Sequence, residues 1–115
     1  MGYRVRICRK TAENIEENGR VVGERITILH SQKQDVWFNN DSSQLADWLN
    51  TYCVDTVIPE EREDWEVWVE DLKHFPQEAF ADNEIQGYTG DELRRFTEEC
   101  IAMANKDGWV HLEWF

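Results

Sequence analysis

The segment PEEREDWEVWVEDLKHF, residues 59–75, decides the predicted order of helices and strands. Its pattern of apolar residues fits either a helix or a strand. Pro59 suits the first turn of a helix, and Pro76 suits its end. The apolar residues that share one face at helical spacing are Ile58, Trp65, Trp68, Val69 and Leu72. Trp65, Val67 and Val69 also alternate as in a strand, but Glu and Asp are poor strand residues. The segment is therefore predicted to be a helix.

The residues before this segment indicate strands and then a helix. YRVRICR, residues 3–9, alternates apolar and basic side chains with the period of a half-buried strand. Residues 10–20 are polar and contain the pair Asn18-Gly19, which predicts a turn-rich connection with room for one helical turn. Residues 21–38 are predicted to form a hairpin around the polar turn SQKQ. Leucines and aromatic residues at helical spacing predict a helix over about 42–53.

The C-terminal part predicts one more helix and one more strand. Thr89 and Glu92 have the spacing of a capping box, and Asp107-Gly108 ends the helix that follows. WVHLEWF, residues 109–115, alternates as a terminal strand. The order β-β-β-α-α-α-β predicts a single α+β domain over residues 1–115. We expect a mostly antiparallel four-stranded sheet with three helices packed on one face.

Charge restricts the partners that the chain can bind. The sequence has 24 acidic and 12 basic residues, for a formal net charge of -12 and a pI near 4.5. Residues 1–40 carry seven basic and five acidic residues, a net of +2, whereas residues 41–115 carry five basic and nineteen acidic residues, a net of -14. Such a surface repels nucleic acids and anionic membranes, so direct binding to either is not expected.

The three cysteines predict a reducing environment. Cys8, Cys53 and Cys100 are an odd number at wide spacing, with no C-x-x-C pair. The N-terminus MGYRVR has no apolar run that would serve as a signal peptide, and no segment reaches transmembrane length. We therefore expect free thiols and a cytoplasmic location.

Metal and cofactor motifs fail at specific positions. DNEIQGYTGDEL, residues 82–93, begins like a calcium-binding EF-hand loop, but its last position is Leu93 where a bidentate Glu is required. HLE, residues 111–113, lacks the P-C-x-x-C that completes a zinc deaminase site. On a strand, His111 and Glu113 point the same way and can pair across the surface. No metal site, cofactor or catalytic residue is assigned.

The acids of residues 60–71 give the predicted binding surface. On a helix, Glu66 and Glu70 repel each other by roughly 0.2–0.5 kcal/mol, so this row of charge does not serve helix stability. Val67 is expected to point outward among the acids, as an apolar contact inside a charged rim. The residues predicted to bind a partner are Glu60, Glu63, Asp64, Glu66, Val67, Trp68, Glu70 and Asp71.

Six tryptophans are many for 115 residues, and tryptophan is frequent at binding hot spots. Trp48, Trp65 and Trp114 lie on apolar stripes and are expected in the core. Trp68 and Trp109 are expected to be partly exposed. For Trp68 and Trp109, a role in an interface and simple packing are expected equally.

The pattern as a whole predicts a small acidic protein–protein interaction module. The favoured role is an inhibitor that occupies a basic, nucleic-acid-binding surface of its partner. This profile is similar to that of nuclease immunity proteins and phage-encoded inhibitors, as a likeness of class and not of family. One alternative is a small enzyme or ligand-binding domain with a pocket between sheet and helices. The other is a homo-oligomeric structural protein that pairs through Trp109 or the last strand.

Overall fold

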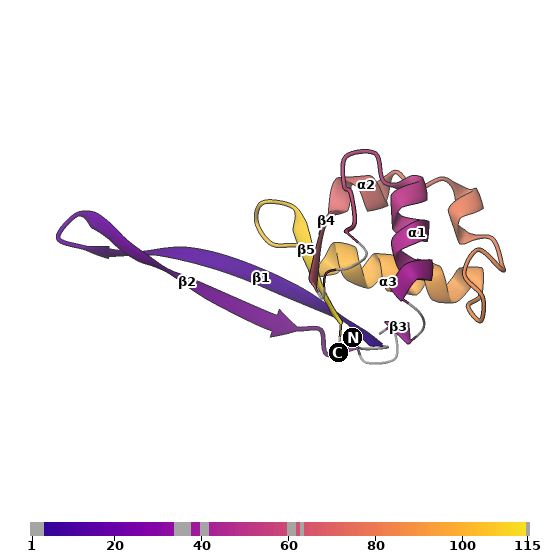
Figure 1. Cartoon of the computed structure of the whole chain (residues 1–115), viewed down its shortest axis with the longest axis horizontal. Helices are drawn as coiled ribbons and strands as arrows, with labels where there is room; N and C mark the ends of the chain where they lie inside the picture. The colour runs from indigo at the N-terminus through magenta and orange to yellow at the C-terminus, as the bar shows by residue number, and fades with distance from the viewer. Residues whose placement is uncertain (1–3, 34–37, 40–41, 60–61, 63, 115) are drawn as a thin grey trace.

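The computed structural model describes residues 4–33, 38–39, 42–59, 62 and 64–114, and Figure 1 shows their arrangement. These described residues form five strands, three α-helices and one short 3-10 helix. Their bounds are β1 Arg4–Glu17, β2 Arg20–His30, β3 Phe38–Asn39, α1 Ser42–Tyr52, β4 Asp64–Trp68, α2 Val69–Lys73, η2 Gln77–Phe80, α3 Gly90–Ala102 and β5 Trp109–Trp114.

The sheet is antiparallel and has the strand order β2-β1-β5-β4. The short β3 pairs with the start of β1, where Arg4 lies opposite Asn39 and Val5 opposite Phe38. The three α-helices pack together against one face of this sheet (Figure 1). The predicted class, an α+β domain built on a four-stranded antiparallel sheet with three helices, is confirmed.

The helix predicted over residues 59–75 is wrong in its first half. Residues 64–68 form β4, and only Val69–Lys73 are helical. In β4, Trp65 pairs with Leu112 and Val67 with Val110, and all four side chains are buried. Burying both side chains against β5 outweighs the poor strand propensity of the acids, which point to the other face. The observed order therefore has a strand between α1 and α2.

The predicted hairpin over residues 21–38, of which 34–37 lie outside the described residues, is also wrong, because β2 pairs with β1. The turn is Asn18-Gly19, which joins two long strands instead of lying in an irregular connection. Asn18 has a φ of 52° and Gly19 a φ of 76°, and positive φ at both residues is the geometry of a two-residue type I′ turn. The twist of a type I′ turn matches the twist of the strands that it joins. β1 accordingly extends through the polar residues 10–17 to reach this turn.

The core lies between one face of the sheet and the helices. Val5, Ile7 and Leu112 on the sheet pack with the buried residues of the helices. The apolar stripes of α1 and α3 supply Leu45, Trp48, Leu49, Leu93, Phe96 and Cys100. The predicted capping box at the start of α3 is present, since Thr89 and Glu92 exchange both hydrogen bonds.

The distal halves of β1 and β2 leave this body as a projecting two-stranded arm (Figure 1). We define the arm as residues 11–29, because among the described residues β1 beyond Cys8 pairs only with β2. The molecule measures 56 × 28 × 26 Å, and its radius of gyration is 15.3 Å. A compact chain of this length would have a radius of gyration of about 13 Å. None of the described helices is long and apolar enough to cross a membrane.

Candidate functional site

The structure does not assemble the predicted acidic helix face. Glu60 and Glu63 lie outside the described residues. Asp64 and Glu66 are exposed on β4, and Trp68 is half-buried beside them on the same face of the strand. Because they belong to a strand, these three side chains are presented on the sheet and not along a helix.

The other three predicted residues lie elsewhere. Val67 is wholly buried in the core, so the expectation that it points outward is wrong. Glu70 pairs with Lys73 at 2.8 Å on α2. Asp71 is buried, and its carboxylate accepts backbone N–H groups from residues 54–56. Asp71 therefore holds the loop after α1 and is not available as a contact residue.

The face of the sheet turned away from the helices carries the candidate site. The strand register places His30 of β2 opposite Cys8 of β1, Cys8 opposite His111 of β5, and His111 opposite Glu66 of β4. Side chains opposite one another in a sheet point to the same face. Four residues with metal-binding or acid–base chemistry thus form one row across four strands.

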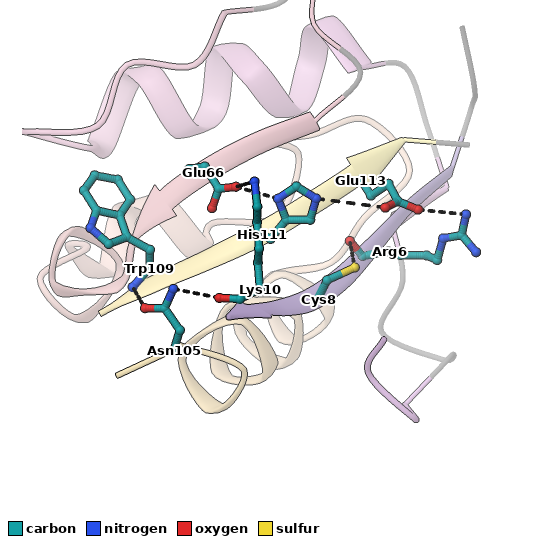
Figure 2. A network of polar contacts seen from close by, with 8 residues as sticks. All are labelled: Arg6, Cys8, Lys10, Glu66, Asn105, Trp109, His111 and Glu113. Atoms are coloured by element: carbon teal, nitrogen blue, oxygen red, sulfur yellow. Dashed lines mark hydrogen bonds and ion pairs between the residues drawn. The ribbon is translucent and has the colours of Figure 1, made fainter. Parts of the chain in front are cut away.

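His111 is the centre of this row (Figure 2). Its ring is only 2 % exposed, and Nδ1 lies 2.6 Å from Oε1 of Glu66. An ionised carboxylate can only accept, so Nδ1 carries the proton and donates it to Glu66. Lys10 Nζ lies 3.5 Å from the same oxygen and balances its charge. In the neutral imidazole, this hydrogen bond leaves His111 Nε2 as the acceptor nitrogen.

Glu113 lies beside the row and contacts three cationic or titratable groups. Its Oε1 is 3.0 Å from Arg6 Nη2 and 3.8 Å from His30 Nε2, and its Oε2 is 3.9 Å from His111 Nε2. His111 and Glu113 point to the same face of β5, as the sequence predicts, with 3.9 Å between these two atoms. Figure 2 shows Glu113 between Arg6 and His111.

The thiol of Cys8 completes the cluster. Cys8 is wholly buried, and its Sγ lies 3.8 Å from the backbone oxygen of Arg6. Burial, with the nearby Glu113, raises the pKa of Cys8 to about 12. A thiol with that pKa is almost entirely protonated at neutral pH, so Cys8 alone is a poor nucleophile. All three cysteines are free, as the sequence predicts.

A cleft lies at the root of the arm, next to the row. It has a volume of about 560 Å³, and Trp109 stands at its wall with 37 % of its surface exposed. The side chain of Asn105 links two residues that line the cleft (Figure 2). Its amide group donates to the backbone oxygen of Lys10 at 2.9 Å, and its oxygen accepts from the backbone N–H of Trp109 at 3.1 Å. Three acids, Glu13, Glu66 and Asp107, also line the cleft, together with Lys10 and Lys106. The predicted partial exposure of Trp109 and Trp68 is confirmed.

Sequence reasoning did not find this row. Cys8 and His30 have no ligand-like neighbours in the chain, and Glu66 was assigned to a helical face. The one available signal was His111 and Glu113 pointing the same way on the last strand. The other members are brought there by strand register, which joins residues up to 103 positions apart.

Comparison with known proteins gives no match, whether to a family model, a curated protein or a solved structure.

Proposed function

We propose that this chain is a small acidic protein-interaction module that binds a basic protein surface, with the arm as its main contact. One observation carries the proposal. Among the described residues, six of the nine exposed large hydrophobic side chains belong to the arm. They are Ile15, Val21, Val22, Ile26, Ile28 and Leu29.

Exposing the apolar side chains of such an arm to water is energetically unfavourable. A two-stranded ribbon is only marginally stable in water, and an exposed apolar strand edge invites pairing with other chains. These six side chains are about half exposed, so covering each would contribute roughly 1 kcal/mol. A partner that covers the arm would therefore gain affinity by burying apolar surface within a small contact area.

Charge favours a basic partner over a second copy. Two copies of this chain, each with a net charge of -12, repel each other at low ionic strength. A positively charged surface is attracted to the same body and associates faster as salt is lowered. The arm itself carries four acidic and two basic residues, a net of -2, and its register places Glu13 opposite Arg25 and Glu17 opposite Arg20.

The cleft at the root of the arm suits a basic side chain. Trp109 offers an aromatic face against which a Lys or Arg of the partner can stack. Glu13 and Asp107 on the cleft wall are exposed carboxylates that can accept from the same group. Basic protein surfaces commonly bind nucleic acid, so occupying one would inhibit that binding.

The test compares two variants matched in chemistry. Val22→Ser/Ile26→Ser/Ile28→Ser removes apolar surface from the arm, and Val54→Ser/Val57→Ser removes the two most exposed valines outside it. Each protein is used to capture partners from lysate under cross-linking. The captured partner is then purified, and its affinity for each variant is measured by calorimetry at low and raised salt.

We expect a basic partner that binds wild type and the Val54/Val57 variant equally, and the arm variant at least tenfold more weakly. Raised salt should weaken binding, and nucleic acid should compete with it. Equal affinity for all three proteins would refute the arm as the contact. A wild-type dimer in light scattering that the arm variant abolishes would identify a second copy as the occupant and overturn the proposal.

A further inference from the structure

We propose that Cys8, His30 and Glu113, with His111 as the fourth ligand, form a binding site for a zinc-class divalent metal ion on the open face of the sheet. One ligand atom from each of the first three residues lies within 4.8 Å of the other two. A tetrahedral zinc site, with bonds of about 2.0–2.3 Å, needs separations of roughly 3.3–3.8 Å. The donor atoms would therefore have to move closer together to coordinate the ion.

The donor set matches the chemistry of zinc. Zinc prefers thiolate sulfur, imidazole nitrogen and carboxylate oxygen, and this cluster offers all three kinds. The donors come from three strands, with His30 and His111 directly opposite Cys8 on either side. The backbone ladder therefore holds the donors in place before any ion arrives, which lowers the entropic cost of assembling the site.

His111 is prepared as a ligand by its partner. The Nδ1–H group donates to Glu66 at 2.6 Å, so the lone pair is on Nε2. Nε2 lies 3.9 Å from Oε2 of Glu113, so both atoms face the same space. A carboxylate that fixes the tautomer of a histidine is the usual outer partner of a zinc ligand. A cation between Nε2 and Glu113 would satisfy both acceptors.

An ion can reach the cluster from solution. A hollow of about 580 Å³ lies against His111 and Glu113, with Lys10, Ile26 and Ile28 around it. The His30 side chain is 41 % exposed, whereas Cys8 and His111 are buried. Arg6 and Lys10 are each matched by a carboxylate, Glu113 and Glu66, so the cluster has no uncompensated positive charge that would repel the ion.

Cobalt(II) is the probe, because it takes the tetrahedral sites of zinc and reports its ligands by absorption. Titrating the full chain should give one equivalent of bound cobalt, intense tetrahedral d–d bands and a thiolate-to-cobalt charge-transfer band. Added zinc should bleach all of these. Cys8→Ser should remove the charge-transfer band, and His30→Ala or Glu113→Gln should weaken cobalt binding at least 100-fold. Glu66→Gln should weaken it about 10–100-fold by freeing the tautomer of His111.

The controls are Cys53→Ser and His74→Ala, which change the same residue types away from the cluster. Both should bind cobalt like wild type. Circular dichroism checks folding, and the partly exposed Glu113→Gln gives an answer even where Cys8→Ser does not fold. Octahedral cobalt without a charge-transfer band, or unchanged affinity in folded His30→Ala and Glu113→Gln, would overturn the proposal.

Discussion

Asp71 on α2 accepts the backbone N–H of Thr56 at 2.8 Å, although the two residues lie 15 positions apart. The same carboxylate accepts from the N–H groups of Val54 and Asp55 at 3.2–3.3 Å. One buried side chain thus satisfies three successive backbone donors of the loop that follows α1. The hydroxyl of Thr56 in turn accepts from the N–H of Trp68, which ties this loop to β4.

Replacing Asp71 by Asn should destabilise the fold by about 2–3 kcal/mol. The amide has one acceptor oxygen in place of two charged ones, and its NH₂ group faces buried donors. Chemical denaturation at neutral pH measures this difference. The control is Glu70→Gln, which alters a surface pair with Lys73 and should change stability by less than about 0.5 kcal/mol. Similar values for the two variants would contradict the structural role of Asp71.

The stability of the wild type should fall in acid partly through Asp71. Burial alone would raise the pKa of this carboxyl, but hydrogen bonds from Thr56, Asp55 and Val54 lower it below the ordinary value of 3.8. A depressed pKa in the folded state means that this contribution is complete above pH 3.8 and is lost as the pH falls through the folded-state pKa. The difference in stability between wild type and Asp71→Asn should therefore shrink below pH 3.8. A constant difference would show that Asp71 has no depressed pKa.

The fold class was predictable because three segments carry strong periodic patterns. Residues 3–9 and 109–115 alternate, and the capping box of Thr89 and Glu92 marks the start of α3, so two strands and the start of a helix were placed correctly. The predicted end of this helix at Asp107-Gly108 is wrong, because α3 ends at Ala102. In each of these segments the buried face belongs to the core, and burial produces the pattern.

Two segments misled the prediction for physical reasons. WEVWV, residues 65–69, fits both periods, and the choice depends on whether β5 lies beside it, which no local pattern contains. The distal part of β1 is polar because the arm packs on no core, so it lacks the alternation that marks a strand. The Asn18-Gly19 pair is the signal for the arm in the sequence, because it is typical of a two-residue hairpin turn.

The candidate metal cluster could not be predicted from spacing. Cys8, His30 and His111 lie far apart in sequence and meet only because the antiparallel register places them in one row. A shift of one residue between β1 and β5 would turn Cys8 and His111 to opposite faces. Register follows from the packing of Ile7 and Leu112 in the core, which is a property of the whole sheet.

Cys53 should react slowly with thiol reagents in the native protein despite its partial exposure. Burial, with the nearby Asp71, raises its pKa to about 12, so at pH 8 only about one molecule in ten thousand carries the thiolate. Ellman's reagent should label it much faster after unfolding in urea. Asp71→Asn should speed native labelling, because it removes the charge and loosens the loop. Native labelling at the rate of a free cysteine would contradict this environment.

The arm should exchange its amide hydrogens faster than the rest of the sheet. Residues 11–29 have one pairing partner per strand and add nothing to the buried core, whereas β5 is paired on both sides. Local opening of a two-stranded ribbon therefore costs little free energy. Hydrogen exchange followed by mass spectrometry should show this contrast, and binding of a basic partner should slow exchange in the arm. Equal protection of arm and β5 in the free protein would contradict it.

Gly90 should be the glycine least tolerant of substitution. A Cβ at this position would lie 1.9 Å from the carbonyl oxygen of Phe80, a backbone atom that cannot rotate away. Its own N–H donates to Asp82 at 2.7 Å, so a shift of α3 would also break this contact. Gly90→Ala should therefore cost at least about 2–3 kcal/mol by displacing η2 from α3. Gly23→Ala is the matched control, because its nearest neighbour is a side-chain atom at 3.9 Å, and thermal unfolding should show little change for it. A melting temperature for Gly90→Ala near that of wild type would mean that η2 and α3 are not in close contact.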